Sequence, residues 1–131
     1  MLNITTNVKV KEWDTSTTWF DEEGILYSVS KKGTQQSLEE TKKRFEEFKA
    51  LIGNNKICML IDVTNTSESS REIRNYAAEE LPKIVKAIAI VSTSSVGKKL
   101  ANLFFTLKTQ PYPTKMFNNE TEAKKWLQQF L

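Results

Sequence analysis

The stretch that decides the fold is Lys56-Ile57-Cys58-Met59-Leu60-Ile61-Asp62-Val63. Five consecutive apolar residues, Ile57 to Ile61, are followed directly by an acid. A strand with one wet face would alternate apolar and polar residues, whereas this continuous run is typical of a strand covered on both faces. We therefore expect an inner strand of an α/β sheet.

Further strands are expected on both sides of this run. Upstream, apolar and polar residues alternate, and the turn Asp21-Glu22-Glu23-Gly24 separates two alternating segments, which is typical of an antiparallel pair. Downstream, Lys86 to Val91 is a second buried run, and Lys115 to Phe117 is a short strand after Pro111-Tyr112-Pro113. The upstream strands are expected at Val8 to Trp13, Thr17 to Phe20 and Ile25 to Ser30.

Helices are expected between the later strands, each opening on a side chain that caps it. The capping pairs, three residues apart, are Ser37 with Glu40, Ser69 with Glu72 and Asn119 with Glu122. Gly53 ends the first of these helices, and Pro82 limits the second. A further helix with a wide apolar surface is expected from Val96 to Leu107.

The first helix carries oppositely charged residues four apart. Glu39 precedes Lys43, and Glu40 precedes Arg44, in the order that stabilises a helix. We interpret both pairs as part of a solvated helix face.

The element order is therefore β-β-β-α-β-α-β-α-β-α in a single domain, residues 1–131. The predicted fold class is α/β, a mixed β-sheet with an antiparallel N-terminal part and alternating β-α units, its helices packed on the sheet. Binding sites in such sheets form at the carboxyl ends of parallel strands, where βα loops converge. Those loops run here from Asp62 to Ser70 and from Ser92 to Ser95.

Composition excludes several classes of site. The 131 residues include no His and one Cys, Cys58, with a formal net charge of +3. Without His, Ser-His-Asp and Cys-His catalysis and His-ligated metal sites are excluded. A single Cys excludes an intramolecular disulfide and a thiolate metal cluster, and in an apolar strand its thiol stays protonated. We expect no metal, no cofactor and no enzymatic activity.

The loop after Asp62 is the first candidate site. Ser69 or Ser70 opens the following helix, where backbone N–H groups and the helix dipole stabilise a phosphate. Arg71 and Arg74, on one helix face, would pair with this phosphate or with an anionic ligand. The same residues fit a simpler interpretation, in which one serine caps the helix and the arginines are surface residues.

The second candidate site lies at the start of the next helix. Ser94 and Ser95, with Lys98 in the first turn, offer hydroxyls, N–H groups and positive charge to an anion. Capping explains the hydroxyls equally well. A domain that binds a small anionic or amphipathic molecule between the two loops is therefore the alternative function.

Other partners follow from the distribution of apolar and charged residues. Leu103, Phe104 and Phe105 in succession cannot all face one core, so we expect the helix from 96 to 107 to support a homodimer. Basic residues interleaved with acids disfavour nucleic-acid binding. The longest apolar runs have five residues, and Met1 to Val10 lacks the apolar core of a signal peptide. We expect a cytoplasmic protein without stable membrane insertion.

Several segments of the second half carry a family resemblance. They are Leu60-Ile61-Asp62, Ser70-Arg71-Glu72 with Arg74, Ala87-Ile88-Ala89-Ile90-Val91, Pro111-Tyr112-Pro113-Thr114-Lys115-Met116-Phe117, Glu122-Ala123 and Trp126-Leu127. Together they resemble bacterial SpoIIAA-like proteins, small stand-alone domains of the STAS/Sec14 type. The resemblance covers Lys56 to Leu131 by motif. It implies a four- or five-stranded mixed sheet with helices on it and no established catalytic activity.

The resemblance also implies a role for the loop after Asp62. In the anti-sigma-factor antagonists of that fold, a partner kinase phosphorylates a Ser that opens the helix after an Asp-ended strand. Ser69 or Ser70 occupies the comparable place, with Glu68-Ser69-Ser70-Arg71 where those proteins carry Asp-Ser-Ser-Gly. The sequence therefore predicts a non-enzymatic regulatory or protein-interaction domain of STAS-like type. It would act on an unidentified protein partner through the face from Asp62 to Arg74.

Overall fold

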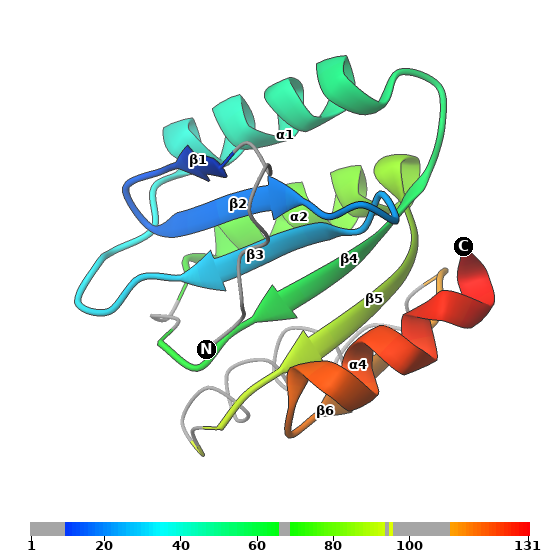
Figure 1. Cartoon of the computed structure of the whole chain (residues 1–131). Helices are drawn as coiled ribbons and strands as arrows, with labels where there is room; N and C mark the ends of the chain where they lie inside the picture. The colour runs from blue at the N-terminus through cyan, green and yellow to red at the C-terminus, as the bar shows by residue number, and fades with distance from the viewer. Residues whose placement is uncertain (1–9, 66–68, 94, 96–110) are drawn as a thin grey trace.

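A six-stranded sheet forms the centre of the molecule, with the strands in the order β1-β2-β3-β4-β5-β6 (Figure 1). The computed structural model describes residues 10–65, 69–93, 95 and 111–131. The strands are β1 (Val10–Glu12), β2 (Ser16–Phe20), β3 (Leu26–Ser30), β4 (Ile57–Asp62), β5 (Val85–Val91) and β6 (Thr114–Phe117). The helices of the described part are α1 (Leu38–Ile52), α2 (Arg71–Ile84), α4 (Glu120–Leu127) and the 3₁₀ helix η1 (Gln128–Phe130).

The sheet is mixed, as the sequence predicts. β1, β2 and β3 pair antiparallel, whereas β3, β4, β5 and β6 pair in parallel. The apolar run from Ile57 forms β4, an inner strand in which Leu60 pairs with Tyr27 of β3 and with Ala89 of β5. The α/β fold class and the antiparallel N-terminal part are therefore confirmed.

Helices cover the two faces of the sheet, with α1 and α2 behind it and α4 in front in the view of Figure 1. Alternate residues of β4 point to opposite sides, since Met59 shares a core cluster with Phe45 of α1 and Leu81 of α2. Leu60 belongs to the cluster on the other face, with Leu127 of α4. Both sides of β4 are apolar because both are covered.

Local sequence signals fix the helix ends. The Ser37 hydroxyl accepts the Glu40 N–H at 3.1 Å at the start of α1, and the Asn119 side chain accepts the Glu122 N–H at 2.9 Å at the start of α4. Gly53 ends α1 with φ of 63°, a left-handed conformation that glycine adopts without strain. These three predicted signals are confirmed.

The structure departs from the family resemblance in the number of strands, and it locates the end of α2. The sheet has the six strands of the predicted element order rather than the four or five that the resemblance implies, because the short β1 pairs along β2. Pro82 lies in the last turn of α2, which ends at Ile84 and passes directly into β5 at Val85. A proline in the last turn removes a single backbone hydrogen bond, which a helix about to end tolerates.

The apolar helix expected from Val96 to Leu107 lies outside the described residues, so the predicted homodimer through it stays a prediction. Among the helices that the structure describes, none is long and apolar enough to cross a membrane.

Candidate functional site

The carboxyl ends of β4 and β5 lie next to each other, and hydrogen bonds join the segments that follow them. The Val63 N–H donates to the Val91 carbonyl at 2.9 Å. The Thr93 N–H donates to the Thr64 hydroxyl at 3.2 Å. This contact arises because β4 and β5 are parallel neighbours, with Asp62 opposite Val91. The described parts of the two βα loops therefore converge, as the topology of the sequence predicts.

The Asp62 side chain is buried and forms a hydrogen bond within the loop that follows β4. The residue is 6% exposed, and its Oδ1 accepts the Thr64 N–H at 2.9 Å. A carboxylate that accepts an N–H two residues further along orders a tight turn. Asp62 is therefore positioned to shape the loop at the end of β4.

Ser70, not Ser69, caps α2. The Ser70 hydroxyl accepts the Ile73 N–H at 3.2 Å, and its backbone is extended, with φ of −68° and ψ of 161°. The predicted capping pair of Ser69 with Glu72 is wrong by one residue. The helix begins at Arg71, and the Arg74 N–H donates to the Ser70 carbonyl at 3.0 Å, which makes Ser70 the capping position; the Ser69 carbonyl accepts a hydrogen bond from the Arg74 guanidinium. Ser69 thus contributes its main chain to this end of the helix.

The two arginines at this end of α2 differ in their surroundings. Arg71 is the first helical residue and is exposed, whereas Arg74 is half-buried and donates to the Ser69 carbonyl. Both positive charges lie near the positive end of the helix dipole, with Glu72 as the acid of the first turn. An anion bound beside Ser70 would offset this local excess of positive charge.

The structure tests little of the second candidate site. Ser94 and Lys98 lie outside the described residues, and Ser95 is exposed. Ser92, which comes directly after β5, is fully buried, and its N–H donates to the Phe117 carbonyl at 3.2 Å. The anion site predicted at Ser94, Ser95 and Lys98 therefore stays a prediction.

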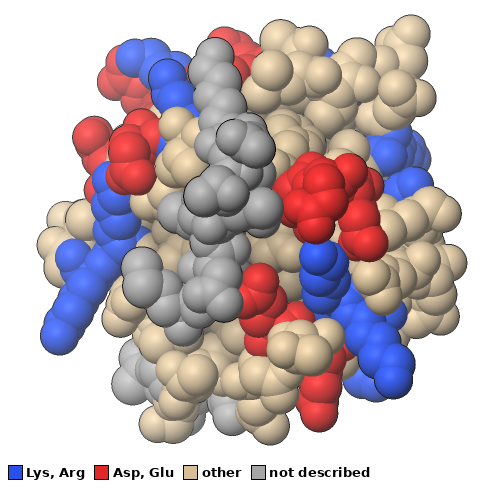
Figure 2. Space-filling model, in the orientation of Figure 1, with Lys and Arg blue, Asp and Glu red and all other residues tan. Residues whose placement is uncertain are grey.

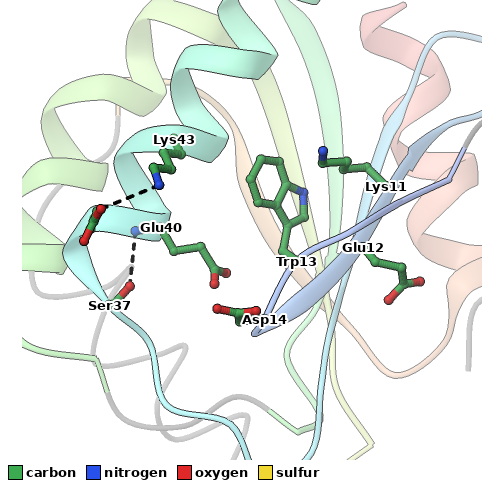
Figure 3. Close-up of a pocket in the computed structure, with 8 residues that line it drawn as sticks. Lys11, Glu12, Trp13, Asp14, Ser37, Glu40 and Lys43 are labelled. Carbon is green, nitrogen blue, oxygen red and sulfur yellow. Dashed lines mark hydrogen bonds and ion pairs between the residues drawn. The ribbon is translucent and has the colours of Figure 1, made fainter.

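A cavity of about 380 Å³ lies elsewhere, between the turn after β1 and the first turns of α1 (Figure 3). One wall is the half-buried Trp13 ring, and Ser37 and charged side chains from both segments form the remainder. The lining residues are Lys11, Glu12, Trp13, Asp14, Ser37, Glu39, Glu40 and Lys43.

Beneath the cavity lies a polar network, which we call the Glu40 network, formed by Glu40, Arg44, Thr15 and Ser16. The Thr15 hydroxyl donates to Glu40 Oε1 at 2.8 Å, and the Thr15 N–H donates to the same oxygen at 3.3 Å. Arg44 Nη1 donates to the hydroxyls of Thr15 and Ser16 at 3.0 and 3.2 Å. The Glu40 and Arg44 side chains are 13% and 16% exposed, so the prediction that this pair is solvated is wrong.

Burial and hydrogen bonding act in opposite directions on these two charges. Burial acts to raise the pKa of Glu40, but the hydrogen bonds from Thr15, the charge of Arg44 and a side-chain hydrogen bond with Asp14 outweigh it, and the pKa lies below its ordinary value. Burial lowers the pKa of the Arg44 guanidinium, and Glu40 offsets part of this effect. The pair therefore remains ionised, joining the turn after β1 to α1.

Helical spacing alone does not distinguish the two predicted pairs of α1. Glu39 and Lys43 lie 3.6 Å apart with side chains 84% and 67% exposed, as predicted. Glu40 and Arg44, one position along, face the turn after β1 instead. The sequence signal that distinguishes the two pairs is Thr15-Ser16 at the start of β2. Both residues are buried, so their hydroxyls need hydrogen-bond partners, which Glu40 and Arg44 provide.

The described residues offer little to a metal or cofactor. Within ranges 10–65, 69–93, 95 and 111–131, no group of three or more Asp, Glu, Cys or His side chains is placed to hold a metal ion. Cys58 is fully buried in β4, and burial raises the pKa of its thiol, as the sequence predicts for a core residue. Figure 2 shows basic side chains next to acidic ones across the visible face rather than gathered in one patch.

Comparison with known proteins places the chain in a family. The model of a domain of unknown function, DUF7793, matches residues 18–131. The chain belongs to the DUF7793 family. The match begins within β2 and runs to residue 131, and so includes both α2 and the Glu40–Arg44 pair of α1. No curated protein matches the chain.

Among solved structures, the DUF7793 chain is similar to an uncharacterized protein of the DUF3478 family from Shewanella loihica PV-4 with a SpoIIAA-like fold. The two share 18% identity and a TM-score of 0.58 over 95% of this chain and 99% of that one. This likeness confirms the SpoIIAA-like fold. A protein of unknown function from Arthrobacter sp. FB24 shares 25% identity over 85% of this chain and 97% of that one, with a TM-score of 0.32.

Proposed function

We propose that this DUF7793 chain is a regulatory protein-interaction domain of STAS-like type, with Ser70 as a phosphorylation site. The observation that carries the proposal is the position of Ser70, an exposed serine whose hydroxyl caps α2. A phosphoryl group on that oxygen would lie at the positive end of the helix dipole. The site would act as a switch because modification changes the charge of an exposed surface.

The charges around Ser70 support the same assignment. Arg74 is held at the start of α2 by its hydrogen bond to the Ser69 carbonyl, and Arg71 is exposed in the first turn. Guanidinium groups form charge-assisted hydrogen bonds with phosphate oxygens. Arg71 is therefore the side chain with the freedom to pair with a phosphate, and Arg74 supplies a fixed positive charge beside it.

The segments next to α2 support a surface suited to a partner. Asp62 orders the turn after β4, and the Thr64 hydroxyl joins that turn to Thr93. Loops positioned by a rigid sheet commonly carry binding residues. A partner that docks on α2 and these loops would contact Ser70 directly. A phosphate on Ser70 would therefore strengthen or weaken the binding of that partner.

The fold gives further support. The structural likeness to a protein with a SpoIIAA-like fold agrees with the resemblance that the sequence carries. In the antagonists of that fold, the phosphorylated serine opens the helix after an Asp-ended strand, and Ser70 opens α2 after β4, which ends at Asp62. We propose binding rather than catalysis because Asp62 is buried and already accepts the Thr64 N–H.

Phosphoserine placed at residue 70 by genetic encoding tests the proposal. The phosphorylated and unmodified chains are used to capture proteins from the cells that make the DUF7793 protein, with quantitative mass spectrometry as the readout. We expect at least one bound protein to change by about tenfold, equivalent to about 1.4 kcal/mol of binding free energy. Phosphoserine at residue 69 is the matched control. Identical sets of bound proteins for the phosphorylated and unmodified chains would refute the proposal.

A further inference from the structure

The cavity beside Trp13 has no part in the proposed function of α2. We propose that it binds an organic cation, a primary ammonium or guanidinium group, between the Trp13 ring and the carboxylates of Asp14 and Glu40 (Figure 3). The inference goes beyond the proposed function and does not depend on it. Four features of the described residues lead to it.

First, the indole is fixed before a ligand arrives. Trp13 Nε1 donates to the Thr18 hydroxyl at 3.0 Å, and the Trp13 carbonyl accepts from Lys31 Nζ at 2.6 Å. The Trp13 N–H donates to the Ser16 carbonyl at 2.8 Å. Because the ring and its backbone are held from both sides, a ligand would lose little affinity to ordering this wall.

Second, the Trp13 ring already attracts a cation. Lys11 Nζ lies 5.2 Å from the ring centroid, within the range of a cation–π interaction. In Figure 3 the ring lies between Lys11 and the Glu40 side chain. The Lys11 side chain is 55% exposed, and its ion pair with Glu47 is long, at 3.9 Å. A ligand cation can therefore displace Lys11 from the Trp13 ring, or it can bind to the opposite face of the ring while Lys11 stays.

Third, the carboxylates of Asp14 and Glu40 lie next to each other at the cavity (Figure 3), and hydrogen bonding to Asp14 is one of the causes that lower the pKa of Glu40. The hydrogen bonds from Thr15 fall on Oε1 of Glu40, as does the ion pair with Arg44 at 3.7 Å. Glu40 stays ionised, because its pKa lies below the ordinary value despite burial. Two neighbouring carboxylates repel each other unless they share a proton, and a cation beside them relieves that repulsion.

Fourth, the remaining acids of the lining have partners. Glu12 pairs with Lys31 at 2.7 Å, and Glu39 pairs with Lys43 at 3.6 Å. Asp14 has no lysine or arginine within 4.0 Å among the residues that the structure describes. Asp14 is therefore the acid of the lining that is left without a basic partner, and its carboxylate favours a cation over an anion.

The place of the cavity in the sheet agrees with a binding role. Ser16 at the start of β2 pairs with Ser30 at the end of β3, so the turn after β1 lies at the carboxyl end of the parallel strands. Ligands of α/β sheets commonly bind outside that end. The cavity volume, about 380 Å³, suits a small molecule or one side chain. The cation has two conceivable sources, a free amine or a Lys or Arg side chain of another protein.

NMR titration of the ¹⁵N-labelled full chain with n-butylammonium tests the inference, with butanoate and butanol as matched probes. We expect the Trp13 indole signal and the Asp14 amide to shift saturably with n-butylammonium, with a Kd of about 1–10 mM for so small a probe. The buried Trp19 indole serves as the internal control. Butanoate that binds as well as n-butylammonium, or n-butylammonium that gives no saturable shift, would overturn the inference.

Asp14→Asn identifies the carboxylate responsible. Asp14 is exposed in a turn, so this variant retains the fold, and we expect the Kd for n-butylammonium to rise at least about fivefold. Glu39→Gln, at the exposed edge of the cavity, should change the Kd by less than about twofold. Equal effects of the two substitutions would contradict the assignment to Asp14.

A lysine tripeptide, acetyl-Gly-Lys-Gly-amide, distinguishes the two sources of the cation. Binding about tenfold tighter than that of n-butylammonium would identify a protein side chain as the ligand. Binding equal to or weaker than that of the free amine would identify a small-molecule amine. Both results leave the ammonium group as the recognised chemistry.

Discussion

Substitution of Ser70 by Ala removes the side chain that caps α2. The Ser70 hydroxyl accepts the Ile73 N–H at 3.2 Å, and without it this N–H has no capping acceptor from that side chain. Replacing a capping Ser by Ala costs about 1 kcal/mol, within a range of about 0.5–2 kcal/mol. The same substitution at Ser69 leaves in place the backbone carbonyl that Arg74 contacts. We therefore expect Ser70→Ala to destabilise the protein and Ser69→Ala to change its stability by less than about 0.5 kcal/mol.

The expected loss of free energy can be expressed as a change in Tm, because the unfolding entropy scales with chain length. At about 2.1 cal/mol/K of unfolding entropy per residue, 131 residues give about 0.28 kcal/mol/K. A loss of about 1 kcal/mol then lowers Tm by about 4 °C. Ser70→Asp retains an acceptor and adds negative charge at the start of α2, so its Tm should stay within about 2 °C of the unmodified protein.

Urea denaturation and thermal unfolding, both followed by circular dichroism, give the free energy of unfolding and the Tm of Ser70→Ala, Ser69→Ala and Ser70→Asp. The decisive comparison is between residues 69 and 70, because the sequence pattern with Glu72 predicts the cap at Ser69 whereas the structure places it at Ser70. A loss of stability for Ser69→Ala equal to or larger than that for Ser70→Ala would refute the described geometry of this helix end.

Two further predictions concern buried ion pairs. Arg44→Met removes the cation of the Glu40 network and should lower the free energy of unfolding, measured by urea denaturation, by about 2 kcal/mol. The control Lys43→Met, on the exposed face of α1, should change it by less than about 0.5 kcal/mol. Equal losses for the two variants would contradict the buried network. Hydrogen bonds from Lys49 and Lys83 hold the pKa of Glu80 below its ordinary value of 4.5, so the stability that Glu80 contributes is present above that pH and is lost as pH falls through the lowered pKa. Glu80→Gln should therefore flatten the fall in Tm below about pH 4.5, and an unchanged pH profile would show that this pair contributes nothing.

Patterns local in sequence predicted the sheet. The continuous apolar run into Asp62 identified β4 as an inner strand because burial on both faces leaves no position for polar residues. Gly53 and the caps at Ser37 and Asn119 set helix ends through contacts within a few residues. Such signals can be read from sequence because the groups that meet are neighbours along the chain.

The cavity beside Trp13 could not be predicted in this way, because it depends on two segments brought together by the sheet. Glu40 and Arg44 show the spacing of an exposed pair, and the fold buries them against Thr15, 25 residues from Glu40. The choice between Ser69 and Ser70 was also beyond the pattern, since both serines can cap a helix. The start of α2 at Arg71, with the Arg74 N–H bonded to the Ser70 carbonyl, decides between them.

The most direct test of the account is the phosphorylation state of the protein isolated from the cells that make it. Peptide mass spectrometry of the segment that contains residues 69 and 70 should find a phosphoryl group on Ser70 in part of the population, removable by phosphatase. An unmodified Ser70 under every growth condition, or a phosphoryl group on Ser69 alone, would contradict the assignment of the start of α2 as a phosphorylation switch.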